Sequence, residues 1–175
     1  MNLEDNERKT SGLHCLWPET SNEDYKAALK LAKDGGSPNN ISPIITYSVA
    51  EVAKFMWMGD IEGDFLEKVK DCINFQEITV FFAPHHGRDS GKIPNDILKK
   101  LNPKIIVIGE APSQNLNYYN NYNAIKQNSA GYIVFEQSGS KLNIYVGNKN
   151  YSEDFLKNNG YMNAHGCYYI GTLKT

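Results

Sequence analysis

Two short segments carry residue types that hold metal ions in proteins. Asp60 ends the apolar segment 53–60 after a single glycine, and His85 and His86 directly follow the apolar segment 77–84. A carboxylate oxygen and an imidazole nitrogen together suit Zn²⁺, Mn²⁺ or Fe²⁺, and one aspartate can bridge two such ions. The two segments therefore raise the hypothesis of a metal-dependent site.

Each segment also has an ordinary structural interpretation. A Gly-Asp pair at the end of a strand is usually a turn or a cap, and a His-His pair can be an exposed part of a loop. The two segments together, in this order and at strand ends, favour the metal hypothesis. That hypothesis requires the side chains of Asp60 and His85 to lie within ~6 Å of each other and to face one pocket.

An alternation of strands and helices must position these residues. From residue 54 to residue 109 the pattern alternates strand, helix, strand, helix, strand, which predicts an α/β fold in which helices cover the faces of a sheet. Such sheets carry their functional loops at strand ends. The expected strands are 41–49, 53–60, 77–84 and 104–110, and the expected helices are 64–73 and 94–103.

The remaining elements follow from the same patterns. We expect one domain over 13–175, after a disordered start at 1–12. The helix at 21–36 directs Tyr25, Ala28, Leu29 and Leu31 to one face, and the helix at 64–73 directs Phe65, Leu66, Val69, Cys72 and Ile73 inward. The other expected elements are a strand at 13–17, a helix at 118–128, a hairpin at 131–147 with its turn at Ser138-Gly139, a helix at 152–160 and a strand at 167–173.

The composition bounds the classes of function. The chain has 175 residues, of which 41% are hydrophobic and 22% charged, and its net charge is −2. This is a globular composition without the basic surplus typical of nucleic-acid binders, although a nucleotide substrate stays compatible with it. Three widely spaced cysteines indicate reduced thiols in a cytoplasmic protein. Since neither a signal segment nor an apolar run of ~20 residues is present, we expect no membrane association.

Residues 39–69 and 78–110 resemble the second half of the metallo-β-lactamase fold. The specific part of the resemblance is Gly59-Asp60-Ile61-Glu62 followed by Pro84-His85-His86-Gly87. Within that fold the chain resembles the hydrolase-like domain of competence-type DNA-uptake channel proteins and their stand-alone relatives, over roughly residues 13–149. The resemblance implies a layered αβ/βα fold of which this chain holds only the second half.

The resemblance also implies roles for single residues. Asp60 would bridge two Zn²⁺ or Mn²⁺ ions, and His85 would be the last metal ligand. His86 would contact the substrate or support the ligands, while Arg88 and Lys92 would meet a phosphate group of the substrate. The two ions would share a hydroxide that attacks a phosphorus or carbonyl centre.

The first half of the family pattern is missing. Its His-x-His-x-Asp-His motif supplies most of the metal ligands, and this sequence contains no His-x-His. His14 is expected to be structural and His165 to be a loop residue. Two ligands do not hold a binuclear centre, so the isolated chain is expected to bind metal weakly or not at all.

Three explanations stay open for the missing half. The chain is the C-terminal part of a longer protein, a split half completed in trans, or a degenerate relative that keeps the fold as a binding module. The expected helices cover one face of the sheet, and the other face would need a complementary half-domain or a homo-oligomer. The function expected from the sequence is part of a metal-dependent hydrolase for phosphoesters or nucleic acids. The alternative is a catalytically inactive interaction subunit.

Overall fold

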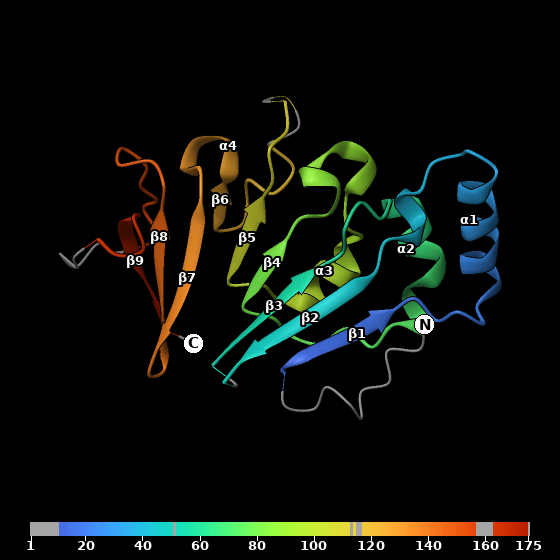
Figure 1. The fold of residues 1–175 in the computed structure, drawn as a ribbon, viewed down its shortest axis with the longest axis horizontal. Coiled ribbons are helices and arrows are strands. Elements are labelled where there is room, and N and C mark those ends of the chain that lie inside the picture. The colour runs from blue at the N-terminus through green and yellow to red at the C-terminus, as the bar shows by residue number, and fades with distance from the viewer. Residues whose placement is uncertain (1–10, 51, 113, 115–116, 157–162, 175) are drawn as a thin grey trace.

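The computed structural model describes residues 11–50, 52–112, 114, 117–156 and 163–174, which form a mixed α/β structure with two β-sheets (Figure 1). The large sheet has the strand order β1-β2-β3-β4-β5-β6, and the small sheet has the order β7-β8-β9. The strands of the large sheet are β1 (Leu13–Trp17), β2 (Ile44–Val49), β3 (Ala53–Trp57), β4 (Val80–Phe82), β5 (Ile105–Ile108) and β6 (Ala124–Lys126). Those of the small sheet are β7 (Ile133–Ser138), β8 (Lys141–Val146) and β9 (Tyr168–Lys174).

The large sheet changes from antiparallel to parallel pairing at β3. The pairs β1–β2 and β2–β3 are antiparallel, whereas β3–β4, β4–β5 and β5–β6 are parallel. Parallel neighbours need crossover connections, and the helices α2 (Gly63–Val69) and α3 (Asn95–Leu101) lie in those from β3 to β4 and from β4 to β5. The carboxyl ends of β3, β4 and β5 therefore share one edge of the sheet, which we call the carboxyl rim.

Helices cover one face of the large sheet. Apolar side chains of α2 and α3 pack with Met56, Phe81 and Ile106 of the sheet into one buried cluster; those of the helices are Phe65, Leu66, Val69, Ile97, Leu98 and Leu101. Helix α1 (Glu23–Lys33) begins after Asn22, whose side chain accepts a hydrogen bond from Tyr25 N. This cap satisfies one of the free N–H groups of the first helical turn.

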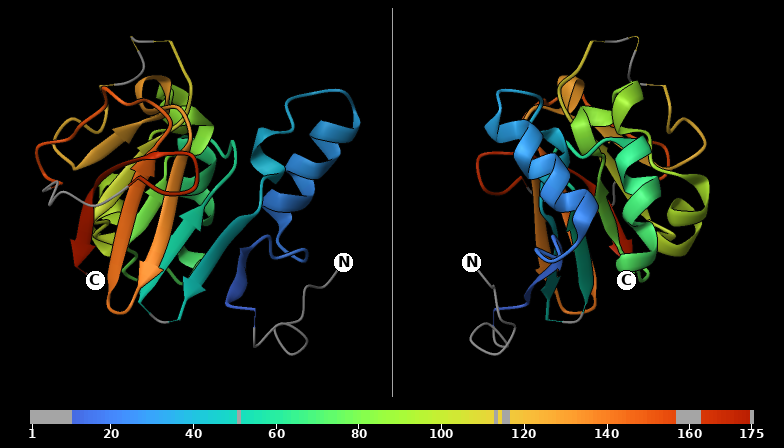
Figure 2. Two further views of the ribbon diagram at one scale, coloured as in Figure 1. Left: turned by 60° about the vertical axis from the view of Figure 1, so that its left-hand side comes forward. Right: turned by 90° about the vertical axis from the view of Figure 1, so that its right-hand side faces the viewer.

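The small sheet covers part of the opposite face. Phe55, Val80 and Val107 of the large sheet are buried with Leu142 of β8, and the ring of Phe135 lies 5.4 Å from that of Phe55. The expectation that this whole face needs a partner is therefore wrong over β3–β5, because the chain covers it with its own C-terminal strands. Figure 2 (left) shows that β1 and β2 extend beyond this cover.

Several predicted features differ from the structure. The helix expected at 118–128 is replaced by strand β6 and the short helix α4 (Gln127–Ala130), because Ala124 and Ile125 pair with β5. Leu31 is 55% exposed, since α1 touches the core mainly through Ala28. Cys72 is also exposed because a 3₁₀ turn at Lys70–Cys72 rotates it off the face of α2.

Most of the other predicted elements are present. The strands β1 to β5, the helices α1 to α3, the β7–β8 hairpin and β9 lie where the sequence pattern predicts them, within a few residues. The helix expected at 152–160 is a turn as far as residue 156, and its remaining residues lie outside the described part, as do residues 1–10. No helix in the described part is long and apolar enough to cross a membrane.

Candidate functional site

The loop that follows β3 carries Asp60 and is held in place by polar side chains. Ser42 Oγ accepts a hydrogen bond from Asp60 N at 3.0 Å. The carboxylate of Glu62 accepts hydrogen bonds from Asn39 Nδ2 at 3.1 Å and from Asn40 Nδ2 at 3.2 Å, while Glu62 N donates to Asn40 Oδ1 at 3.0 Å. Glu62 therefore anchors the loop, because both asparagine side chains donate hydrogen bonds to its carboxylate.

The loop that follows β4 has an uncommon backbone. His85 (φ 48°, ψ 41°) and His86 (φ 56°, ψ 22°) both adopt the left-handed conformation, and Gly87 follows with φ 77°. Left-handed residues other than glycine cost about 1–3 kcal/mol each and persist only where the surroundings impose them. Two adjacent histidines in this conformation therefore mark a segment that the rest of the fold constrains.

A backbone contact joins the two loops. His85 N donates a hydrogen bond to Gly59 O at 3.0 Å, and the strands that precede the loops pair in parallel with Trp57 opposite Phe82. Asp60 and His85 consequently lie on neighbouring loops at the carboxyl rim, next to the residues that form this bond. The carboxylate and the imidazole predicted from the sequence come from the same edge of the sheet.

The two histidine side chains have different surroundings. His85 is half-buried, and its Nδ1 lies 2.8 Å from Ser90 Oγ. His86 is exposed and lies against Gly109, where an added Cβ would come within 2.7 Å of His86 Nδ1. Gly109 therefore leaves the space that the His86 ring occupies at the end of β5, and His86 and Gly109 line a pocket that reaches in between the two sheets to Val107 and Ile133.

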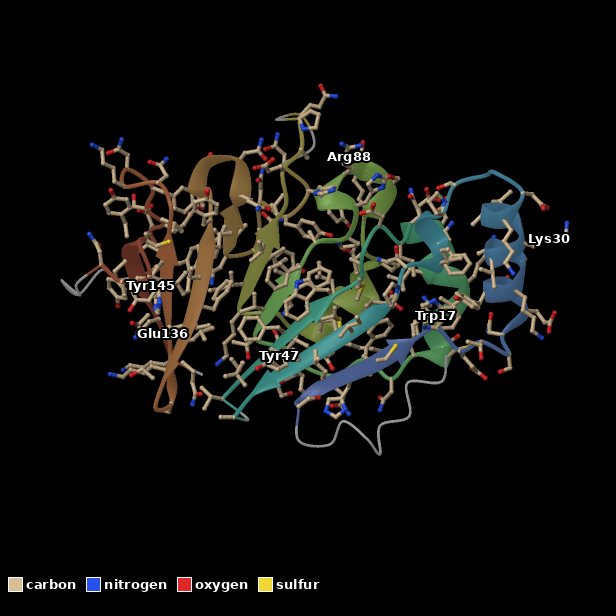
Figure 3. All side chains as sticks on the ribbon, viewed as in Figure 1. Trp17, Lys30, Tyr47, Arg88, Glu136 and Tyr145 are labelled. Carbon is tan, nitrogen blue, oxygen red and sulfur yellow. The ribbon has the colours of Figure 1, made fainter. Side chains whose placement is uncertain are left out.

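The two expected phosphate-binding residues also differ. Arg88 is exposed at the carboxyl rim (Figure 3). Lys92 Nζ lies 2.7 Å from Asp89 Oδ1 and 5.0 Å from the centre of the Tyr118 ring, and the hydrogen bond to Asp89 raises the pKa of Lys92. Arg88 is thus open to a ligand, whereas Lys92 is already paired.

The part of the chain that the structure describes contains no complete metal site around Asp60 and His85. Over those residues, no group of three or more His, Cys, Asp or Glu side chains is arranged to hold a metal ion. His165 does not approach the carboxyl rim, because it belongs to the small sheet and lies 2.9 Å from Glu136. The metal-ligand roles of Asp60 and His85 therefore stay a prediction.

A second polar cluster, which sequence analysis missed, lies on the outer face of the small sheet. Glu136 accepts hydrogen bonds from Tyr145 Oη at 2.9 Å and Asn143 Nδ2 at 3.5 Å, and it also contacts His165 Nε2. Thr172 Oγ1 donates to Asn143 Oδ1 at 2.7 Å. Figure 3 shows Glu136 and Tyr145 side by side. We call these five residues the Glu136 cluster.

Hydrogen bonding and burial shift the pKa values of two residues in this cluster. The hydrogen bonds from Tyr145, His165 and Asn143 lower the pKa of Glu136, in that order of importance. Burial and the neighbouring carboxylate raise the pKa of Tyr145. The one sequence signal for this cluster is the Ser138-Gly139 turn. The turn fixes the register of the hairpin, in which Glu136 lies opposite Asn143.

Comparison with known proteins adds no family assignment: no protein-family model matches the chain, and no curated protein matches it. The α/β architecture and the carboxyl rim are therefore the basis for any functional argument.

Proposed function

We propose that the chain contributes part of the metal centre of a metal-dependent hydrolase that acts on phosphoesters, including nucleic acids. The observation that carries the proposal is the pair of left-handed histidines, hydrogen-bonded through His85 N to the loop of Asp60. Strained backbone of this kind concentrates at sites that bind ligands. In this proposal a second polypeptide segment supplies the remaining ligands.

The residues of the carboxyl rim fit such a centre chemically. Asp60 and His85 would hold the ions, and the contact between His85 Nδ1 and Ser90 Oγ leaves His85 Nε2 available as a ligand. Bound there, a pair of Zn²⁺ or Mn²⁺ ions would supply a hydroxide that attacks a phosphoester at neutral pH. Arg88 offers a planar set of donors suited to a phosphate group, and His86 is exposed in the same loop.

A catalytically inactive interaction subunit is the second candidate. It is favoured by the pairing of Lys92 with Asp89 and by the lack of a third ligand among the described residues. In that case the two loops keep the shape of a metal site without its chemistry. The two candidates differ in one measurable property, which is affinity of the carboxyl rim for a divalent ion.

Paramagnetic Mn²⁺ tests the proposal on the chain alone. We expect Mn²⁺ at millimolar concentration to broaden the amide resonances of residues 59–62 and 85–88 before any others, because a partial ligand set binds weakly but locally. Asp60→Asn should remove this selective broadening. His165→Gln is the matched control and should keep it.

Two results would contradict the metal centre. One is broadening of the carboxyl rim that persists unchanged in Asp60→Asn. The other is the absence of any selective broadening at the carboxyl rim with millimolar Mn²⁺. The second result would favour the interaction subunit.

A further inference from the structure

Strand β7 has an open edge that faces the uncovered part of the large sheet. Its neighbour on one side is β8, and no strand in the described part of the chain pairs with its other side. Gly147 N donates to Tyr132 O, so in this antiparallel register the even-numbered residues of β7 bond to β8. The N–H and C=O groups of Ile133, Phe135 and Gln137 therefore point to the open side.

The other sheet edges are blunted, and β7 is not. Strand β1 has an irregular register between Cys15 and Trp17 and ends at Pro18, β6 has three residues, and β9 pairs irregularly and ends in Lys174. Proteins protect open edges with such irregularities, short strands, prolines and lysines. The six residues of β7 keep a regular register, and their one charge, Glu136, is engaged on the outer face.

An apolar surface lies beside this edge. The register of β1, β2 and β3 directs one set of side chains to the same face as Phe55, and all of them are at least partly exposed. We call this set the shelf: Leu13, Cys15, Ile45, Tyr47 and Trp57. Leu13 is 39% exposed, and in Figure 3 Tyr47 lies on β2, beyond the strands of the small sheet. The rings of Tyr47, Phe55 and Trp57 follow one another at 6.4 and 6.0 Å, which makes the surface aromatic.

We propose that a β-strand of another polypeptide pairs with the open edge of β7 and packs its apolar side onto the shelf. A strand added about 4.8 Å beyond β7 would extend the small sheet over β2. Because stacked sheets pack about 10 Å apart, the same strand would bond to the edge of β7 and contact the shelf with its side chains. This inference is linked to the proposed function at one point: the partner that binds β7 would also carry the missing metal ligands. The partner is defined by its alternating apolar and polar strand.

A second copy of this chain does not fit the same place. Symmetric antiparallel pairing of two β7 strands puts the two-fold axis perpendicular to the small sheet, so both large sheets lie on the same side of it. Because β1 and β2 extend beyond β7, each copy would occupy the space of the other's large sheet. The geometry therefore favours a partner whose strand can lie beside β7 without a second sheet that overlaps β1 and β2.

The test uses a cyclised 16-residue β-hairpin peptide, free of histidine and cysteine, with valine and isoleucine on one face and threonine and lysine on the other. A scrambled peptide is the control. We expect the hairpin to slow amide hydrogen exchange at Ile133, Phe135 and Gln137, while Val134 and Glu136 stay slow throughout because they bond to β8. The emission of Trp57 should shift to shorter wavelength, whereas Trp17 is buried and should not respond.

Two substitutions at one position separate backbone pairing from side-chain effects. Gln137→Pro removes an N–H that points to the open side and leaves the bonds to β8 intact. Gln137→Ala removes the same side chain and keeps the N–H. We expect the proline variant to bind the hairpin at least about fivefold more weakly than the alanine variant, as loss of one hydrogen bond predicts.

Four results would overturn the inference. The first is slow exchange at Ile133, Phe135 and Gln137 in the free chain, which would mean that the edge is already covered. The second is no effect of the hairpin at 1 mM on the folded chain, and the third is equal affinity of the two Gln137 variants. The fourth is a dimer in which β7 is the protected strand. The hairpin carries no metal ligand, so its failure would leave the Mn²⁺ test of the metal centre unaffected.

Discussion

Two regions of this protein hold histidines in the left-handed backbone conformation, and they treat the imidazole differently. His165, with φ 57°, contacts the carboxylate of Glu136, inside a cluster whose members bond to one another. At the carboxyl rim, His85 is held by one serine hydroxyl and His86 is exposed. The strain at His165 is offset by interactions of its side chain within the protein, whereas the side chain of His86 is exposed. Similar backbone geometry thus serves structure in one region and, we infer, chemistry in the other.

The largest expected effect is on catalysis at the carboxyl rim. In the hydrolase completed by its partner, Asp60→Ala should lower phosphodiesterase activity by about 10³-fold or more, since a bridging carboxylate organises several kcal/mol of metal-dependent stabilisation. Activity is measured on bis(p-nitrophenyl) phosphate at fixed metal concentration. Asp64→Ala, an exposed carboxylate on the adjacent helix, is the control and should keep nearly full activity. Full activity in Asp60→Ala would sink the proposed mechanism.

The next effect concerns stability and belongs to the Glu136 cluster. Asn143 is 4% exposed and bonds to Glu136 and Thr172. Asn143→Ala should lower the free energy of unfolding by about 2–3 kcal/mol, because it leaves buried polar groups without partners. Urea unfolding measures this loss, with the exposed Asn121→Ala as the control. If the two regions are independent, Mn²⁺ broadening at the carboxyl rim stays unchanged in Asn143→Ala.

Glycine substitutions in the two regions should change the free energy of unfolding in opposite directions. His86→Gly should raise the free energy of unfolding by about 1 kcal/mol, since glycine accepts the left-handed backbone without strain and His86 is exposed. His165→Gly relieves similar strain but breaks the contact with Glu136, so it should lower stability. Urea midpoints of the two variants decide the point. A stability loss in His86→Gly would show that its ring is engaged in the fold.

The smallest effect is a dependence of stability on pH. The pKa of Glu136 is lower in the folded chain than its ordinary value of 4.5, so its ionised form favours folding. This contribution is complete above pH 4.5 and is lost as the pH falls through the lower folded pKa. Glu136→Gln removes this titration. We therefore expect the gap in urea midpoint between wild type and Glu136→Gln to narrow as the pH falls below 4.5, and a constant gap would contradict the assignment.

Sequence patterns predicted the carboxyl rim well because its features are local. An apolar run that stops at a polar residue defines a strand end, and the alternation with helices predicts that Asp60 and His85 share an edge. The left-handed backbone of His85 was beyond reach, because it depends on a bond to Gly59 that forms only when β3 and β4 pair. Histidine is enriched among non-glycine residues with a left-handed backbone, but this weak preference does not identify two adjacent ones.

Long-range pairing explains the other differences. Residues 124–126 form a strand because β5 offers an edge, against a local pattern that favoured a helix. Glu136 and His165 are separated by 29 positions. They meet only after β7, β8 and β9 pair, and the register of β8 with β9 is irregular. The cover over Phe55 was predictable in principle, since the hairpin 131–147 alternates apolar side chains such as Phe135 and Leu142 toward one side.

Each sheet is built from one continuous stretch of chain, and this has a consequence during synthesis. The large sheet uses residues 13–126, and the strands that cover its face come from residues 133–174. At 5–20 residues per second, a ribosome needs roughly 2–10 s to add that cover. During this interval Phe55, Val80 and Val107 would face solvent or a chaperone, and the strands β7 to β9 would then remove this apolar face from water.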